Sequence, residues 1–139
     1  MGWIVRKYLF LLGALLLISS IVACGSNTSD EKVDDVDFTV CDDSKVPKEF
    51  LAEINKKKEQ EFTSTFSDGE FMYIAKGYGQ QETGGYSISV TDLYTTKDKV
   101  VMNTKLIGPG QKDLVLRGAT YPYIVVKTEY TQKDVVCDD

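Results

Sequence analysis

The sequence predicts a mainly β domain of the α+β class, a small antiparallel β-sandwich or half-open barrel with one N-terminal helix. Three observations lead to this prediction. A single helical pattern comes first, and apolar and polar residues then alternate along most of the remaining chain. Turn-forming residues separate the alternating runs. The region assigned to the domain, residues 38–139, has a common length for small all-β architectures.

The helix is expected over residues 47–62. Pro47 near the start, Glu49 in the first turn and three lysines in the last are placed as the helix dipole favours. Phe50 and Ile54 fall on one side of this helix, so that side is expected to pack against the sheet while the rest faces water.

Four runs rich in tyrosine, isoleucine, valine and threonine follow, and each predicts a strand. The second run alternates clearly, with Tyr86, Ile88 and Val90 on one face and small polar residues on the other. A hairpin turn over residues 96–99 is expected to join the second and third strands. The predicted strands cover residues 70–76, 86–94, 100–107 and 121–130.

Composition excludes several kinds of chemistry. The 139 residues include no histidine, so a Ser-His-Asp triad or a His-ligated zinc is excluded. The four carboxylates of Asp68, Glu70, Glu82 and Asp92 form no pair that strand geometry would bring together. We therefore expect no enzymatic activity, no catalytic residues, no metal site and no cofactor. An excess of 21 acidic over 16 basic residues also argues against a nucleic-acid partner.

The N-terminus has the pattern of an export signal. A basic start precedes an apolar run, residues 8–18, that is too short for a membrane span. The sequence Ile21-Val22-Ala23-Cys24 then resembles the lipobox of bacterial lipoproteins, in which the cysteine is diacylated and becomes the first residue. Residues 1–23 are thus expected to be a lipoprotein signal peptide and Cys24 the lipidation site. The alternative is an ordinary secretory signal with an incidental cysteine.

Two acyl chains on Cys24 would give stable membrane attachment, so we expect an extracytoplasmic protein anchored to the bacterial cell membrane by lipid. Residues 24–37 hold two isolated valines among polar and acidic residues and are expected to form a lipidated, disordered tether. Removal of the signal peptide leaves 14 basic against 21 acidic residues.

Cys41 and Cys137 remain as a pair near opposite ends of the domain. An exported protein permits a disulfide between them, and closing so long a loop would contribute about 4–5 kcal/mol in the chain-entropy model. Both lie in a Val-Cys-Asp-Asp context, which suggests two terminal strands that meet at one end of the fold. The alternative is two free thiols.

Two glycine-rich loops interrupt the strands, at residues 77–86 and 108–111. A phosphate-binding role for the first is rejected, because its glycines precede a strand and not a helix. Gly84 and Gly85 are instead interpreted as positions that need a positive φ or a close backbone approach, such as a bulge at the start of the strand.

The stretch Thr83-Gly84-Gly85-Tyr86-Ser87-Ile88 resembles the signature of the PrcB family C-terminal domain. Gly79, a proline loop near Pro109 and the Tyr-Pro-Tyr segment at 121–123 extend the resemblance over roughly residues 70–128. The chain departs from the pattern at Gln81-Glu82, where many relatives have a proline before the threonine.

The resemblance implies a non-enzymatic lipoprotein subunit that binds a secreted or cell-surface protease and stabilises its complex. It supplies no catalytic residues. Tyrosines and exposed loop backbone suit a contact surface. The partner-binding residues expected on these grounds are Tyr78, Thr83, Gly84, Gly85, Tyr86, Tyr121, Pro122 and Tyr123. The alternative for Tyr86 and Tyr123 is a place in the core, where each would cap the sheet.

Two other functions are kept open. The loops at 83–86, 108–110 and 121–123 are loosely similar to the three loops that chagasin-type inhibitors insert into a cysteine peptidase, so a loop-mediated protease inhibitor is one alternative. A passive envelope module that binds glycan through exposed tyrosines is the other.

Overall fold

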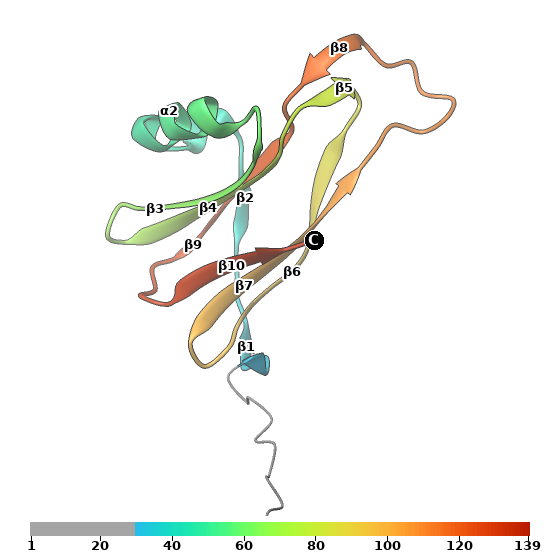
Figure 1. Cartoon of the computed structure of the whole chain (residues 1–139). Helices are drawn as coiled ribbons and strands as arrows, with labels where there is room; N and C mark the ends of the chain where they lie inside the picture. The colour runs from blue at the N-terminus through green and yellow to red at the C-terminus, as the bar shows by residue number, and fades with distance from the viewer. Residues whose placement is uncertain (1–29) are drawn as a thin grey trace, which may run out of the picture.

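The computed structural model describes residues 30–139. Two four-stranded sheets pack face to face, and one helix covers the outer face of one sheet (Figure 1). The expected signal peptide and Cys24 lie outside the described residues. No helix among residues 30–139 has the length and apolar character needed to cross a membrane. The elements are β1 (Asp34–Asp35), β2 (Thr39–Cys41), the 3-10 helix η2 (Asp43–Lys45), α2 (Lys48–Lys57), β3 (Glu61–Ser67), β4 (Phe71–Tyr78), β5 (Gln81–Thr83), β6 (Ser87–Thr95), β7 (Lys99–Ile107), β8 (Arg117–Thr120), β9 (Tyr123–Glu129) and β10 (Asp134–Asp138).

One sheet has the strand order β1-β6-β7-β10 and the other the order β2-β9-β4-β3. Strands β7 and β10 pair in parallel, and the other pairs are antiparallel. Strands β5 and β8 form a separate two-stranded ribbon at one end of the sandwich (Figure 1). The predicted mainly β sandwich with one helix is confirmed, and the strands of residues 30–139 do not close into a barrel.

Strand β4 is buried on both faces. Residues 72–77 are all buried, although side chains along a strand point alternately to opposite sides. Met72 and Ile74 face the β6–β7 sheet, where they join the core between the two sheets. Tyr73 and Ala75 face the helix. The other buried members of the core between the sheets are Leu93, Val100, Met102 and Val126.

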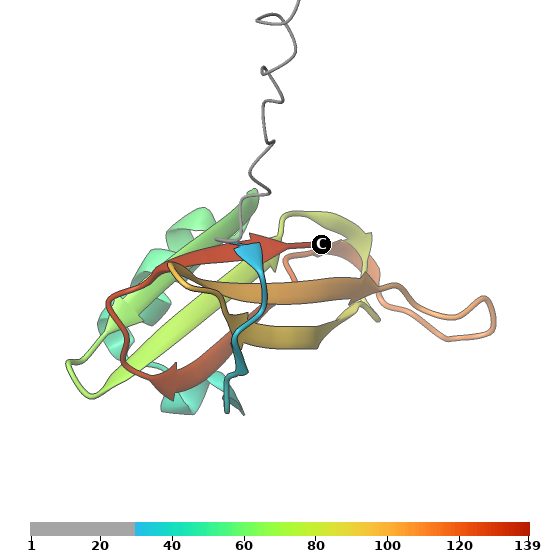
Figure 2. The same cartoon turned by 90° about the horizontal axis from the view of Figure 1, so that it is seen from below.

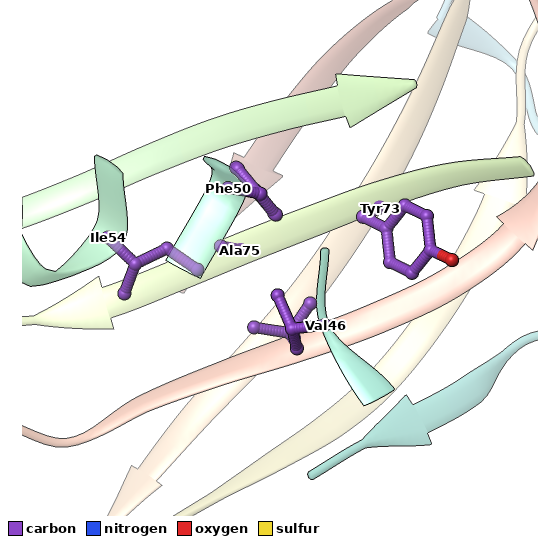
Figure 3. Packing of buried hydrophobic residues seen from close by; sticks show 6 residues of the cluster. Val46, Phe50, Ile54, Tyr73 and Ala75 are labelled. Carbon is purple, nitrogen blue, oxygen red and sulfur yellow. The ribbon is translucent and has the colours of Figure 1, made fainter. Parts of the chain in front are cut away.

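Helix α2 supplies the second core cluster. Phe50 and Ile54 are fully buried against Tyr73 and Ala75 of β4 (Figure 3). The Phe50 ring also stacks on Phe66 of β3, with ring centroids 5.6 Å apart. These contacts hold the helix on the outer face of the sheet, as the apolar side of its sequence predicts.

The helix ends earlier than its sequence pattern predicts. It stops at Lys57, and residues 61–67 form β3 in place of a last helical turn. Phe62 is the reason for the difference, because its ring covers Gly77 of β4. A Cβ atom on Gly77 would lie only 2.6 Å from the Phe62 Cδ1 atom. This tertiary contact outweighs the local preference of 58–62 for a helix.

The four predicted strands correspond to β4, β6, β7 and β9. The predicted hairpin turn is confirmed as well: the Thr96 amide donates to the Lys99 carbonyl at 2.9 Å, and the Thr96 hydroxyl accepts from the Lys99 amide. The sequence did not predict β1, β3, β5 or β8. It suggested that the terminal strands around Cys41 and Cys137 meet, whereas β10 pairs with β7 in parallel.

The described part of the expected tether is ordered. Strand β1 pairs with the end of β6, and the amides of Val33 and Val36 donate to carbonyls of that strand at 2.8 and 2.9 Å. Val36 packs against the core between the sheets. Residues 33–37 therefore pair with β6 and pack on the sandwich, although the sequence assigns them to the tether. Residues 24–29 of the expected tether lie outside the described residues.

The expected disulfide is not formed, and Cys41 and Cys137 are free thiols. Cys41 lies in β2 and packs on the helix side of the β4–β9 sheet, whereas Cys137 lies in β10 and packs on the other side. The sheet separates the two sulfur atoms, so the terminal strands do not meet as their similar sequences suggest. Burial raises the pKa of both thiols.

We predict that Phe50→Ala lowers the free energy of unfolding by about 3–5 kcal/mol, because it leaves a cavity between α2 and the sheet. Urea unfolding of the unlipidated chain measures the change. Phe38→Ala is the matched control, since Phe38 is 38% exposed, and it should cost much less. Equal losses for the two variants would contradict the packing described for Phe50.

Candidate functional site

The β5–β8 ribbon and the loop that leads into it extend from one end of the sandwich (Figures 1 and 2). In the ribbon, Gln81 is paired with Thr120 and Thr83 with Arg117. The Thr120 hydroxyl donates to the Thr83 carbonyl at 2.6 Å, and the Gly84 amide donates to the Leu116 carbonyl at 2.9 Å. These bonds fix the Thr-Gly-Gly segment to the chain entering β8.

Gly85 needs to be glycine for two reasons. Its φ is +86°, a left-handed conformation that residues with a Cβ atom rarely adopt. A Cβ atom there would also lie 2.8 Å from Val115 Cγ1 and 3.0 Å from Pro109 Cβ. At Gly84, by contrast, a Cβ atom would make only ordinary contacts at 3.7 Å, and its φ is not positive. The predicted positive φ and close approach thus apply to Gly85.

A shallow depression of about 190 Å³ lies where this loop meets the start of β9. It is lined by Gly84, Gly85, Tyr86, Thr120, Tyr121 and Pro122. The Lys58 ammonium at the end of α2 lies 5.9 Å from the centroid of the Tyr121 ring and brings a positive charge to its border. The structure therefore brings together five of the eight residues expected to bind a partner, with Thr83 next to them in the ribbon.

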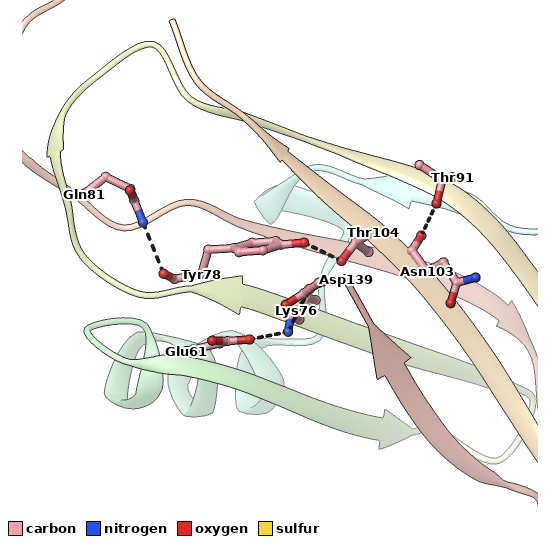
Figure 4. A network of polar contacts seen from close by, with 8 residues as sticks. All are labelled: Glu61, Lys76, Tyr78, Gln81, Thr91, Asn103, Thr104 and Asp139. Atoms are coloured by element: carbon pink, nitrogen blue, oxygen red, sulfur yellow. Dashed lines mark hydrogen bonds and ion pairs between the residues drawn. The ribbon is translucent and has the colours of Figure 1, made fainter.

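Tyr78 is directed elsewhere. Its hydroxyl shares a 2.7 Å hydrogen bond with the Thr104 hydroxyl of β7, between the two sheets (Figure 4). Burial is the main reason that the pKa of the Tyr78 phenol is raised. Only its backbone lies near the depression, since the Tyr78 amide donates to the Pro122 carbonyl at 3.1 Å. Its side chain joins the sheets and does not line the surface where we expected it.

A buried lysine lies beside Tyr78. Lys76 has a side chain only 5% exposed, and its ammonium contacts Glu61 at 2.6 Å and Asp139 at 3.2 Å (Figure 4). Burial alone would lower the pKa of Lys76, but the hydrogen bonds with these two carboxylates outweigh it, and the pKa is raised. The ammonium therefore stays charged and ties β3 and the end of β10 to β4.

Tyr123 also points away from the depression. Its hydroxyl donates to the Asp43 carboxylate at 2.7 Å, and its ring packs against the helix cluster. Burial, followed by the hydrogen bond and the charge of Asp43, raises the pKa of Tyr123 to about 12. This contact joins the start of β9 to the segment before α2.

Sequence reasoning missed two exposed leucines in the loop before β8, one of which, Leu116, contacts the depression at Gly84. Leu114 and Leu116 belong to the loop before β8, and Leu116 accepts the hydrogen bond from Gly84. The Leu-Val-Leu run at 114–116 was the available signal, but an apolar run of this kind usually predicts a buried strand. The two leucines are exposed because of where the loop lies in the fold, and a local sequence pattern does not report that position.

The fold and the site define a small β-sandwich domain that presents a glycine-rich loop and a projecting ribbon. Residues 30–139 contain no group of three side chains arranged to hold a metal ion. Residues 72–129, from β4 to the end of β9, match the family model described as PrcB C-terminal, and this part of the chain is a PrcB C-terminal domain. The match includes the whole depression. No curated protein and no solved structure matches the chain.

Substitution of Gly85 by alanine is expected to destabilise the domain by about 1–3 kcal/mol, because of the positive φ and the contact with Val115. Faster hydrogen exchange at the Gly84 amide should accompany the loss. Gly84→Ala is the control and should change stability by no more than about 0.5 kcal/mol. The account of the loop is wrong if both variants behave alike.

Alkaline pH should weaken the fold partly through Tyr123. Its folded-state pKa is raised above the ordinary value of 10.0, so its contribution is complete below pH 10 and is lost as the pH rises toward 12. Wild type should therefore lose more stability across this window than Tyr123→Phe, as measured by urea midpoints at a series of pH values. Asp43→Asn should also make this loss of stability smaller than in wild type. An identical loss in wild type and Tyr123→Phe would exclude this role of Tyr123.

Proposed function

We propose that this chain is a non-enzymatic lipoprotein, anchored outside the cytoplasmic membrane through Cys24, that binds and stabilises a secreted or cell-surface protease complex. The depression formed by Gly84, Gly85, Tyr86, Tyr121 and Pro122 is the observation that carries the proposal. It lies within the PrcB C-terminal domain and includes the motif by which the sequence resembles that family. The lipobox-like sequence before Cys24 supports the anchor.

The chemistry of the depression suits contact with another protein. Tyr86 and Tyr121 are partly buried, so their rings are already restrained, and little conformational freedom would be lost when a partner covers them. Tyrosine is also among the residues that contribute most to binding energy at interfaces. The depression is shallow, which fits a protein surface better than an enclosed small molecule.

The position of the depression is compatible with an N-terminal anchor. Strand β1 and the β5–β8 ribbon lie at opposite ends of the domain (Figure 1). A membrane anchor that precedes β1 would leave the depression facing away from the lipid surface, where a protease is accessible.

Protease inhibition is the second candidate, favoured by one observation. The three loops that resemble those of chagasin-type inhibitors lie side by side. A Cβ atom on Gly85 would lie 3.0 Å from Pro109, and one on Gly108 would lie 3.4 Å from the Tyr86 ring. Tyr121 lines the same depression. Adjacent loops of this kind can enter an active-site cleft together.

Affinity capture from the native cell envelope tests the proposal, with the full-length lipidated chain as bait. The wild-type chain is expected to recover one protease, and a bait whose residues 83–86 are replaced should lose it. The protease should then keep its activity longer when the chain is bound. A stoichiometric loss of protease activity would instead establish inhibition.

Two control baits separate binding from anchoring and from general surface change. A Lys97→Ser/Asp98→Ser variant alters the exposed turn between β6 and β7 and should recover the protease as wild type does. Cys24→Ser should release the chain from the membrane without loss of binding. Recovery of the same proteins by the wild-type and loop-replaced baits, or of no protease by either, would refute the proposed function.

A further inference from the structure

The loop between β7 and β8, residues 108–116, extends farther from the sandwich than any other connection in the described part of the chain (Figures 1 and 2). We call it the leucine arm. Leu114 is fully exposed and Leu116 is 84% exposed, while Ile107 at the base of the arm is 45% exposed. Single exposed leucines are ordinary, but two strongly exposed leucines lie two residues apart on one projection here, with a half-exposed isoleucine at its base.

The arm is held in place by the glycine loop. Val115 packs against Gly85, and the Leu116 carbonyl accepts the Gly84 amide at 2.9 Å. The arm is also closed on itself, since the Asp113 carboxylate accepts the Gly110 amide at 2.6 Å and the Asp113 amide donates to the Gly110 carbonyl at 3.0 Å. Leu114 and Leu116 are thus exposed while the residue between them is packed. The backbone presents them in a defined position.

The charge around the arm differs from that of the rest of the domain. Lys105, Lys112 and Arg117 are exposed, and none of them forms an ion pair with another residue of the 30–139 region. Two acidic residues lie nearby: the Asp113 carboxylate is bonded to its own loop, and Glu82 is exposed on β5, the strand that pairs with β8. Residues 30–139 hold 14 basic and 21 acidic residues, so a basic border at the arm is a local departure.

We propose that the leucine arm docks on the partner protease, with Leu114 and Leu116 inserted into an apolar pocket bordered by carboxylates. This inference rests on the proposed function and adds to it a second contact region, with the glycine loop as its support. Burial of the two leucine side chains would contribute binding energy through the apolar area removed from water, and a complementary charged border would fix their orientation.

A protein surface is favoured over a lipid surface for two reasons. The arm lies at the end of the domain opposite β1, and so points away from an N-terminal membrane anchor (Figure 1). The acidic excess of the domain also repels anionic lipid headgroups. A protein pocket with carboxylates only at its border complements the local basic charge without needing the whole domain to be basic.

The test measures the affinity of the full-length chain for the protease that the wild-type bait recovers, once that protease is purified. Leu114→Ser/Leu116→Ser should weaken binding about 100-fold, because the complex then buries less apolar surface. Its melting temperature should stay within about 2 °C of wild type, because the two side chains are exposed in the free chain. Val33→Ser/Val40→Ser is the matched control, with apolar side chains 58% and 54% exposed elsewhere, and should bind within about twofold of wild type.

The role of the basic border is tested by the salt dependence of binding. Added salt should weaken wild-type binding, and Lys112→Gln/Arg117→Gln should reduce this salt dependence. A photo-reactive amino acid at position 114 should form a crosslink to the protease in intact cells, whereas one at position 40 should not.

The outcomes distinguish the two proposals. If wild type recovers a protease but the leucine variant binds it within twofold of wild type, the arm inference is wrong and the proposed function stands. If wild type recovers no protease, both fail. Crosslinks from position 114 to a second copy of this chain, or leucine-dependent binding of the unlipidated chain to phosphatidylglycerol vesicles, would also overturn the inference and would identify a different occupant of the arm.

Discussion

The burial of β4 on both faces is the constraint on which the rest of this structure depends. This strand packs against two different neighbours: Met72 and Ile74 pack in the core between the sheets, and Tyr73 and Ala75 pack in the helix cluster. The next residue on the sandwich side is Lys76. Its side chain is almost fully buried, so its charged ammonium needs carboxylate partners. The ion pairs to β3 and to Asp139 follow from that position, as does the closing of the sandwich along this side.

The same strand connects the core to the candidate site. Beyond Lys76, the Tyr78 hydroxyl bonds to Thr104 across the two sheets, and its amide bonds to Pro122 at the start of β9. The chain then enters the ribbon, where Gly85 sets the direction of the following strand and supports Val115. A glycine motif that looks like a contact surface in the sequence is, in the structure, largely a support for the loop that packs on it. Surface and support lie next to each other, so both can belong to one interaction region.

Much of the fold was predictable because periodicity reports which faces are buried. The four longest alternating runs, the hairpin turn at 96–99 and the start of the helix all follow from local pattern. Three features did not, and each depends on contacts distant in sequence. Phe62 leaves the helix because it covers Gly77, β1 is ordered through its pairing with β6, and the two cysteines lie on opposite sides of a sheet. Likewise, the side chains of Tyr78 and Tyr123 were expected at the site by residue type, but their hydroxyl partners Thr104 and Asp43 direct them away from it.

The pairing of β1 with β6 makes the N-terminal attachment of the domain mechanically soft. Its register covers only two residue pairs, and its bonds lie at the end of the sheet, so a pull on the chain from the N-terminal side detaches them one after another. Separation exposes Val36 but leaves the sandwich core in place. Once detached, residues 30–37 extend to about 25–29 Å. Residues 30–37 can therefore lengthen before a strand of the sandwich core has to detach.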